Sequence, residues 1–166
     1  MKPKDEAKAR EIFAATLHEV AEHGLASLSI EAVAKRAGVA TGTVYVYHKG
    51  KEALLDALYL ATKKELASAI FEDTAGQPVR LAFMKTCVAY VDYLMSHRAA
   101  VSFMHQMQNS PLVSEGTRAE ARAVAAPLAE LLERGKREAL LKDLPTPFMI
   151  AFLTGTVDEL ARYLET

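Results

Sequence analysis

The stretch from Ser29 to Lys51 limits what this 166-residue chain can fold into more than any other part of it. It reads SIEAVAKRAGVATGTVYVYHKGK, and its first apolar residues recur at three- and four-residue spacing, which predicts a short amphipathic helix. Gly38 follows, where the chain must turn with a positive φ that glycine adopts at little cost. Thr41 is expected to be the N-cap of a second short helix. Two short helices joined by a tight, glycine-containing turn predict a helix-turn-helix unit.

The rest of the chain also predicts helices only, so we expect an all-α fold. Apolar stripes at helical spacing indicate six helices besides the two of the central unit, and no segment alternates as a strand would. We expect three small helices to form an N-terminal head over residues 1–50, and five to form a body over residues 51–166. Pro127 should kink or restart the helix expected over about residues 112–141. The six further helices are expected at about residues 5–23, 51–71, 79–96, 98–108, 112–141 and 146–164.

Charge and composition narrow the class of protein. The net charge of the whole chain is −1. The central unit, however, carries three lysines and one arginine against a single glutamate. This local excess of positive charge is what phosphate contacts require. Cys87 is alone, so no intrachain disulfide is possible. The charged N-terminus lacks the apolar region of a signal peptide, and the longest apolar run is too short for a bilayer. We therefore expect a cytoplasmic protein with no membrane association.

Motifs for catalysis and for metal or cofactor binding are missing from the sequence. No pair among the five histidines has the spacing of a helical metal site, and no nucleophile elbow, phosphate-binding glycine loop or dinucleotide fingerprint occurs. We therefore expect no enzyme, no catalytic residue, no metal and no cofactor.

The second helix of the central unit carries the side chains expected to contact DNA. If Val44 faces the core of the head, threonines and tyrosines surround the outward face. Threonine hydroxyls can bond phosphates or base edges, and tyrosine hydroxyls reach phosphates. Lys51, in the first turn of the next helix, can meet the DNA backbone. The alternative is that Tyr45 and Tyr47 are half-buried packing residues.

At this point the chain resembles the tetracycline-repressor (TetR) family of bacterial transcription regulators, most specifically over about residues 8–58. The resemblance implies a homodimer that binds a palindromic double-stranded DNA operator, and a small-molecule effector in the body that releases it. By position, Thr41, Gly42 and Val46 would lie nearest the bases. Phosphates would be held by Thr43, Tyr45, Tyr47 and Lys51, together with Ser29 and Arg36.

Two departures from the family pattern bear on the structure. His48 stands where an aromatic or aliphatic residue is usual. Family members usually have a ninth helix, which pairs with the eighth in the dimer, whereas eight are expected here. Three explanations remain open: the bundle is built otherwise, the chain is truncated, or two helices have been merged in the prediction.

The body carries more apolar surface than simple helix stripes need, which suggests a pocket for a largely apolar ligand. For each residue, ordinary core packing is the alternative. A different class of function also stays open, that of a helical ligand-binding or partner-docking protein with a vestigial head. The candidate pocket residues are Phe83, Cys87, Tyr90, Val91, Leu94, Phe103, Met104, Met107, Phe148 and Phe152.

Overall fold

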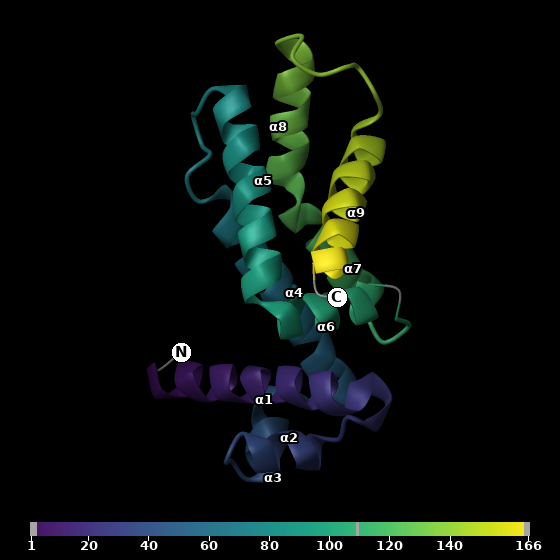
Figure 1. Ribbon diagram of the computed structural model, residues 1–166. Coiled ribbons are helices and arrows are strands. Elements are labelled where there is room, and N and C mark those ends of the chain that lie inside the picture. The colour runs from purple at the N-terminus through teal and green to yellow at the C-terminus, as the bar shows by residue number, and fades with distance from the viewer. Residues whose placement is uncertain (1–2, 109, 165–166) are drawn as a thin grey trace. The chain divides into compact units, whose positions relative to one another are not determined.

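The computed structural model describes residues 3–108 and 110–164, and within these ranges the chain forms nine α-helices and no strand (Figure 1). The predicted all-α fold is confirmed. The helices are α1 (Pro3–Ser27), α2 (Ile30–Arg36), α3 (Thr41–Tyr47), α4 (Lys51–Phe71), α5 (Val79–Ser96), α6 (Arg98–Gln108), α7 (Glu115–Val124), α8 (Ala126–Arg137) and α9 (Thr146–Leu164).

The helices fall into two compact units. The first contains the residues up to Thr62 together with Ala99–Arg118, and the second contains Lys63–Arg98 together with the residues from Ala119 onward. The long helix α4 therefore contributes its first turns to one unit and its last turns to the other. The division into a head over residues 1–50 and a body over 51–166 stays a prediction.

The first unit buries the apolar stripe of α1 against α2, and α2 against α3. Ile12, Val33 and Val44, one from each helix, have no exposed surface. A buried valine or isoleucine contributes about 1.5–3 kcal/mol, so three such residues give three short helices a common core. Gly24, expected to end the first helix, instead kinks it with φ 79° and ψ 163°, and helical structure resumes as far as Ser27.

In the second unit, α5, α8 and α9 pack pairwise against one another. Val79 and Ala82 of α5 are buried with Leu131 of α8, and Phe83 packs against this cluster. Figure 1 shows the three helices side by side in the same arrangement.

The single helix expected over residues 112–141 is wrong. The chain forms α7 and α8 there, separated at Ala125, and Pro127 lies in the first turn of α8. Proline lacks an N–H and its ring clashes with a helical carbonyl four residues earlier, so it is accepted in a first turn and not in a helix interior. α9 is therefore the ninth helix of the described chain, because the prediction had merged α7 and α8 into one helix.

Candidate nucleic-acid interface

The turn between α2 and α3 has the geometry that the sequence predicted at Gly38. Its φ is 67°, a value that disfavours any residue with a Cβ. The amide of Val39 donates to the carbonyl of Ala34 at 3.0 Å and closes the end of α2. At the other end of α2, Ser29 accepts a hydrogen bond from the amide of Ala32 at 3.1 Å, as expected of an N-cap. Both ends of α2 are thus fixed by local interactions.

The expected role of Thr41 as N-cap of α3 is wrong. Ala40 occupies the N-cap position with an extended backbone, and no side chain caps the helix. The amide of Thr43 donates instead to the Ala40 carbonyl at 2.8 Å. Thr41 is the first helical residue, so its hydroxyl does not serve as the cap.

α3 presents one buried face and one open face. Val44 has no exposed surface, while Tyr45 is 49% exposed and Val46 is 82% exposed. Gly42 is exposed as well, whereas Thr41, Thr43 and Tyr47 are half-buried. All of these residues lie on the same seven-residue helix. An apolar side chain as exposed as Val46 gains little from packing within the chain. Its position is that of a side chain available to an external partner.

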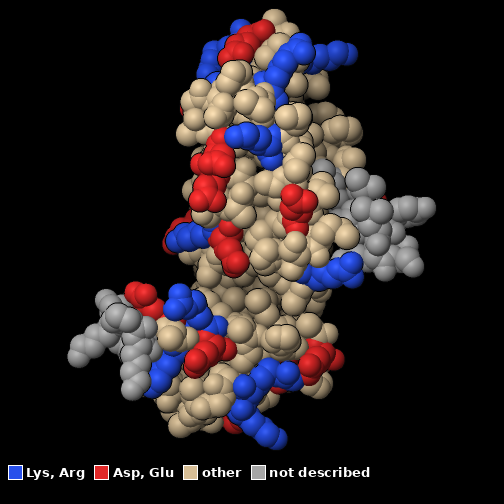
Figure 2. Space-filling model, turned by 60° about the vertical axis from the view of Figure 1, so that its left-hand side comes forward, with Lys and Arg blue, Asp and Glu red and all other residues tan. Residues whose placement is uncertain are grey.

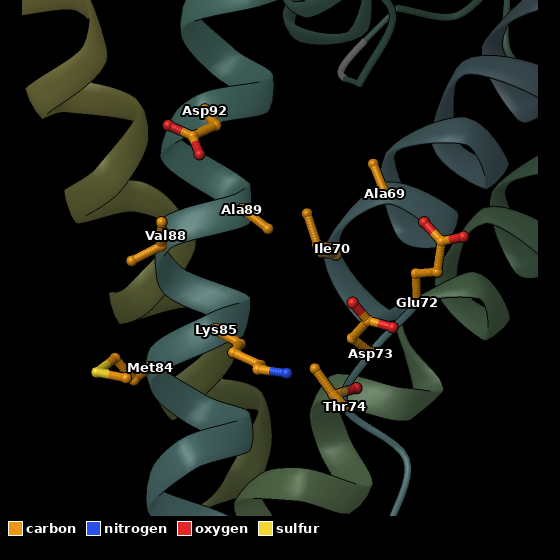
Figure 3. A pocket seen from close by; sticks show the side chains of 10 residues that line it. All are labelled: Ala69, Ile70, Glu72, Asp73, Thr74, Met84, Lys85, Val88, Ala89 and Asp92. Atoms are coloured by element: carbon orange, nitrogen blue, oxygen red, sulfur yellow. The ribbon is translucent and has the colours of Figure 1, made fainter. Parts of the chain in front are cut away.

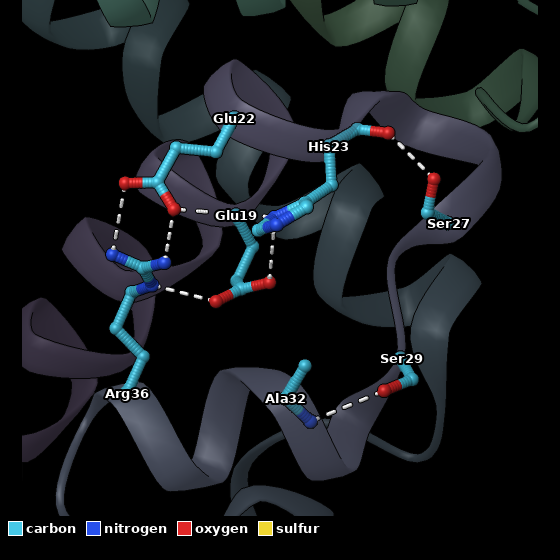
Figure 4. Close-up of polar contacts among 7 residues, drawn as sticks. All are labelled: Glu19, Glu22, His23, Ser27, Ser29, Ala32 and Arg36. Atoms are coloured by element: carbon cyan, nitrogen blue, oxygen red, sulfur yellow. Dashed lines mark hydrogen bonds and ion pairs between the residues drawn. The ribbon is translucent and has the colours of Figure 1, made fainter.

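Arg36 is held by two carboxylates of α1 (Figure 4). Its Nε donates to Oε1 of Glu19 at 2.6 Å, and both terminal nitrogens bond the carboxylate of Glu22. Hydrogen bonding to Arg36 lowers the pKa of Glu19, and the same bond raises the pKa of Arg36. His23 Nδ1 lies 3.4 Å from Glu19 Oε2. The guanidinium therefore ties α2 to α1, and a phosphate contact by Arg36, which stays a prediction, would compete with these bonds.

Charged side chains of opposite sign lie near one another on the surface too, as they do at Arg36 (Figure 2). Acidic and basic side chains alternate over the face shown in Figure 2, with uncharged areas between them. No broad basic patch appears on that face.

Lys51 and His48 both contact α1. Lys51 Nζ donates to the carbonyl of Ala26 at 3.3 Å. The His48 ring lies 5.5 Å from that of Phe13, between centroids, and burial lowers the pKa of His48. His48 thus fills an aromatic position as a neutral ring.

The ten candidate pocket residues are divided between the two units. Phe103 and Met107, in the first unit, have no exposed surface, as core residues would, and Met104 beside them is buried too. Phe148 and Phe152 on α9, in the second unit, are 58% and 63% exposed. The other five, Phe83, Cys87, Tyr90, Val91 and Leu94, lie on α5, also in the second unit.

A groove of about 400 Å³ lies elsewhere in the second unit, between α5 and the end of α4 (Figure 3). Ile70, Met84 and Val88 give it an apolar lining, and Lys85 extends from α5 toward Asp73. None of the candidate pocket residues lines it. Met84 and Val88, four residues apart on α5, are 58% and 55% exposed, and this exposure, which the sequence does not show, is what distinguishes them from core residues.

Two kinds of site are not found over the residues that the structure describes. No three His, Cys, Asp or Glu side chains gather there as metal ligands would. No helix in those ranges combines the length and the apolar character needed to cross a membrane.

Comparison with known proteins places this geometry among regulators. Residues 12–58 match the model of bacterial regulatory proteins of the tetR family. The chain is 36% identical over 83 residues to the fatty acid metabolism regulator protein of Bacillus subtilis. Its fold is similar to a TetR family transcription regulator from Marinobacter aquaeolei, with a TM-score of 0.89 and 24% identity over 98% of this chain and 85% of that one.

A further solved structure carries a ligand in its description. It is the transcriptional regulator FadR from Bacillus subtilis in complex with stearoyl-CoA, similar to this chain with a TM-score of 0.76 and 20% identity over 92% of this chain and 84% of that one. The aligned segments span less than half the length of the curated relatives that the chain matches.

Proposed function

We propose that the chain is a cytoplasmic repressor that binds a palindromic operator as a homodimer. The proposal starts from its family: the chain belongs to the tetR family of bacterial regulatory proteins and is a DNA-binding transcriptional regulator of the helix-turn-helix type. A small, largely apolar ligand in the helical body releases the repressor from the operator. The family consists of transcription factors, which confirms the prediction that the chain is not an enzyme.

The observation that carries the proposal is the open face of α3. Val44 anchors the helix in the core of the head, while Val46 and Tyr45 project from it. A recognition helix needs this division, because its outer side chains must enter the major groove while its inner face holds it rigid. Thr41, Gly42 and Val46 are assigned to the bases, and the hydroxyls of Thr43 and Tyr45 to phosphates.

The remaining phosphate assignments have different support. Tyr47 lies at the end of α3, and Lys51 opens α4 close by. Ser29 and Arg36 both hold α2 in place within the head, so their contribution to DNA binding includes positioning the helix-turn-helix unit as well as any direct contact.

The exposed aromatic pair on α9 supports the homodimer. Phe148 and Phe152 lie one turn apart with ring centroids 6.4 Å from each other, and both are more than half exposed. Exposed apolar side chains that cluster on one helix mark a protein interface more often than isolated ones do. A second copy of the chain is the proposed partner, and replacing both phenylalanines by serine should yield monomers in sedimentation.

The chemistry of the effector is supported by similar proteins of Bacillus subtilis. The curated relative is a fatty acid metabolism regulator protein, and the solved structure from the same organism is the regulator FadR in complex with stearoyl-CoA, so the two are not independent support. The methionines and aromatic residues of this chain suit an adaptable apolar site of the same kind. The proposed ligand is therefore a molecule with a long apolar portion.

A mobility-shift experiment tests the function. The DNA upstream of the chain's own coding region is titrated with protein at about 50 mM and about 200 mM salt, between which six to ten phosphate contacts would lower affinity roughly 10³- to 10⁵-fold. Stearoyl-CoA added to the complex should release the DNA. If no complex forms at the lower salt concentration, the chain is instead a ligand-binding or docking protein with a vestigial head.

A further inference from the structure

Two buried hydroxyls on α5 lack a hydrogen-bond partner among the described residues, as does one other buried polar atom, Nε2 of His48. Thr86 is 5% exposed and Tyr93 is 3% exposed. Neither Thr86 Oγ1 nor the Tyr93 hydroxyl meets a hydrogen-bond partner among the described residues. A buried hydroxyl left without a partner costs about 1–3 kcal/mol of stability, so a pair of them calls for an explanation.

The chain satisfies its other buried threonines in the usual way. Thr16 Oγ1 donates to the carbonyl of Ile12 at 2.7 Å, and Thr62 Oγ1 donates to that of Leu58 at 2.8 Å. Both bonds run to the carbonyl four residues earlier in the same helix, a local partner that any helical threonine can reach. Thr86 lies in the interior of α5 and does not make this bond.

The two hydroxyls share one face of α5. Thr86 follows the buried Val79 by seven residues and Ala82 by four, and Tyr93 follows Thr86 by seven. Spacings of four and seven residues return to the same side of a helix, and seven residues correspond to about 10 Å along its axis. The face that packs against α8 therefore continues along α5 as a line with two polar groups.

The ring of Tyr93 is held in a fixed orientation. It stacks on the ring of His97, with centroids 4.1 Å apart and an interplanar angle of 9°. His97 Nδ1 lies 3.2 Å from the backbone carbonyl of Tyr93. A hydroxyl on a stacked ring loses little further freedom on binding, so it is prepared for a partner.

The charge around Tyr93 indicates which partner suits it. Burial raises the pKa of Tyr93 well above its ordinary range, and the carboxylate of Glu65 raises it further. The phenol therefore stays protonated and acts as a donor. A negative ligand group would meet both a desolvated environment and the Glu65 carboxylate, whereas an uncharged oxygen acceptor would meet neither penalty.

Resting on the ligand-controlled function proposed above, we infer that Thr86 and Tyr93 are the hydrogen-bonding anchors of the effector site, and that they select a largely apolar ligand with an uncharged oxygen, such as an ester or thioester carbonyl. Neither residue stands out in the sequence, because a threonine and a tyrosine within an apolar helix are normally core residues. The apolar residues of α5 supply the surroundings, and the two hydroxyls supply orientation.

The test compares methyl laurate with laurate, two ligands of equal chain length that differ in the charge of the polar end. Binding is measured by thermal shift on the full chain, since a ligand bound only to the native state raises the melting temperature. Wild-type protein should bind the ester and not the anion. Each of Thr86→Val and Tyr93→Phe should weaken ester binding about fivefold, as expected for the loss of one neutral hydrogen bond.

The free variants provide a second readout that a purely structural role would not give. Removing an unsatisfied buried hydroxyl should raise the melting temperature of the free protein by about 2–12 °C, which is about 2–4 °C for each kcal/mol recovered. The control Thr62→Val removes a satisfied hydroxyl, so it should lower the melting temperature and leave ester binding unchanged. Tyr59→Phe serves as the matched tyrosine control and should leave ester binding unchanged too.

Three results would overturn the inference: wild-type protein that does not bind the ester, wild-type protein that prefers the anion, or variants of Thr86 and Tyr93 that bind the ester as wild type does. Mobility shift with the upstream DNA is measured on the same samples. If the wild-type protein binds DNA and loses it with another ligand while these variants respond normally, the anchors are wrong and the regulatory function stands. If no DNA is bound at all, the function itself fails.

Discussion

Two valines of α3 should separate packing from recognition when each is replaced by alanine. Val44 is fully buried, so Val44→Ala removes two carbon groups from the core at about 0.8 kcal/mol each and leaves a cavity, for a loss of about 2 kcal/mol in the free energy of unfolding. Val46 is 82% exposed, and since complete burial of a valine contributes about 1.5–3 kcal/mol, Val46→Ala should change stability by at most about 0.5 kcal/mol.

The effect of Val46→Ala on DNA binding should be the reverse of its effect on stability. If the side chain packs against a base edge, such as a thymine methyl, the two lost carbon groups contribute up to about 1.6 kcal/mol per recognition helix, which is about fifteenfold for one helix and up to about 200-fold for an operator bound by both helices of a homodimer. Binding to non-operator DNA should stay as in wild type, because that binding depends on phosphate contacts.

Fluorescence anisotropy with operator and scrambled duplexes, together with urea unfolding of the free proteins, measures all of these quantities. Val44→Ala is the matched control, because it changes the same chemistry two residues away on the buried face. The reasoning is refuted if Val46→Ala loses operator and scrambled DNA equally, or if it unfolds as readily as Val44→Ala does.

Three further changes test the head. Gly38→Ala should lower stability by about 1–2 kcal/mol through backbone strain alone, since no atom lies within 4 Å of the added Cβ; equal melting temperatures would contradict this. Arg36 depresses the pKa of Glu19, so the stability from this pair is present above the unfolded pKa of 4.5 and is lost as the pH falls through the folded pKa. Glu19→Gln should therefore make the free energy of unfolding, measured in urea, depend less on pH below pH 4.5. An unchanged dependence on pH would count against the pair. Lys51→Ala should reduce the slope of log affinity against log salt by about one for each protomer, or about two for the homodimer, if Lys51 contacts a phosphate; anisotropy measures this slope. An unchanged slope would assign Lys51 to its bond with Ala26 alone.

The sequence predicted the helix-turn-helix unit well because local rules determine it. A glycine is needed wherever φ is positive, and the serine before a short apolar helix has the amides of the first turn within reach of its hydroxyl. Gly38 and Ser29 satisfy both rules. The wrong prediction of one helix in place of α7 and α8 has a local cause as well. Pro127 predicts a kink or a restart, but the alanine-rich pattern continues on both sides of it and does not indicate where one helix ends and the next begins.

Features that depend on residues far apart in the chain could not be predicted from the sequence. The spacing within α2 does not reveal that Arg36 is bound by Glu19 and Glu22 of α1, since those carboxylates lie 17 and 14 residues away, respectively. The unsatisfied hydroxyls of Thr86 and Tyr93 are equally invisible in a pattern, because only the structure shows which buried polar groups have partners. Hydrophobic periodicity identifies candidate core residues but does not distinguish a packed core from the lining of a ligand site.

Hydroxyl-radical footprinting of the DNA upstream of the coding region tests the central claim most directly, because it reports where each recognition helix lies. Two heads of a homodimer should protect two symmetric patches whose centres are about one helical turn apart, or a multiple of it. The same protections should disappear from the Val46→Ala complex at protein concentrations that saturate wild type. A single protected patch, or uniform protection along the duplex, would contradict the binding of a palindromic operator through α3.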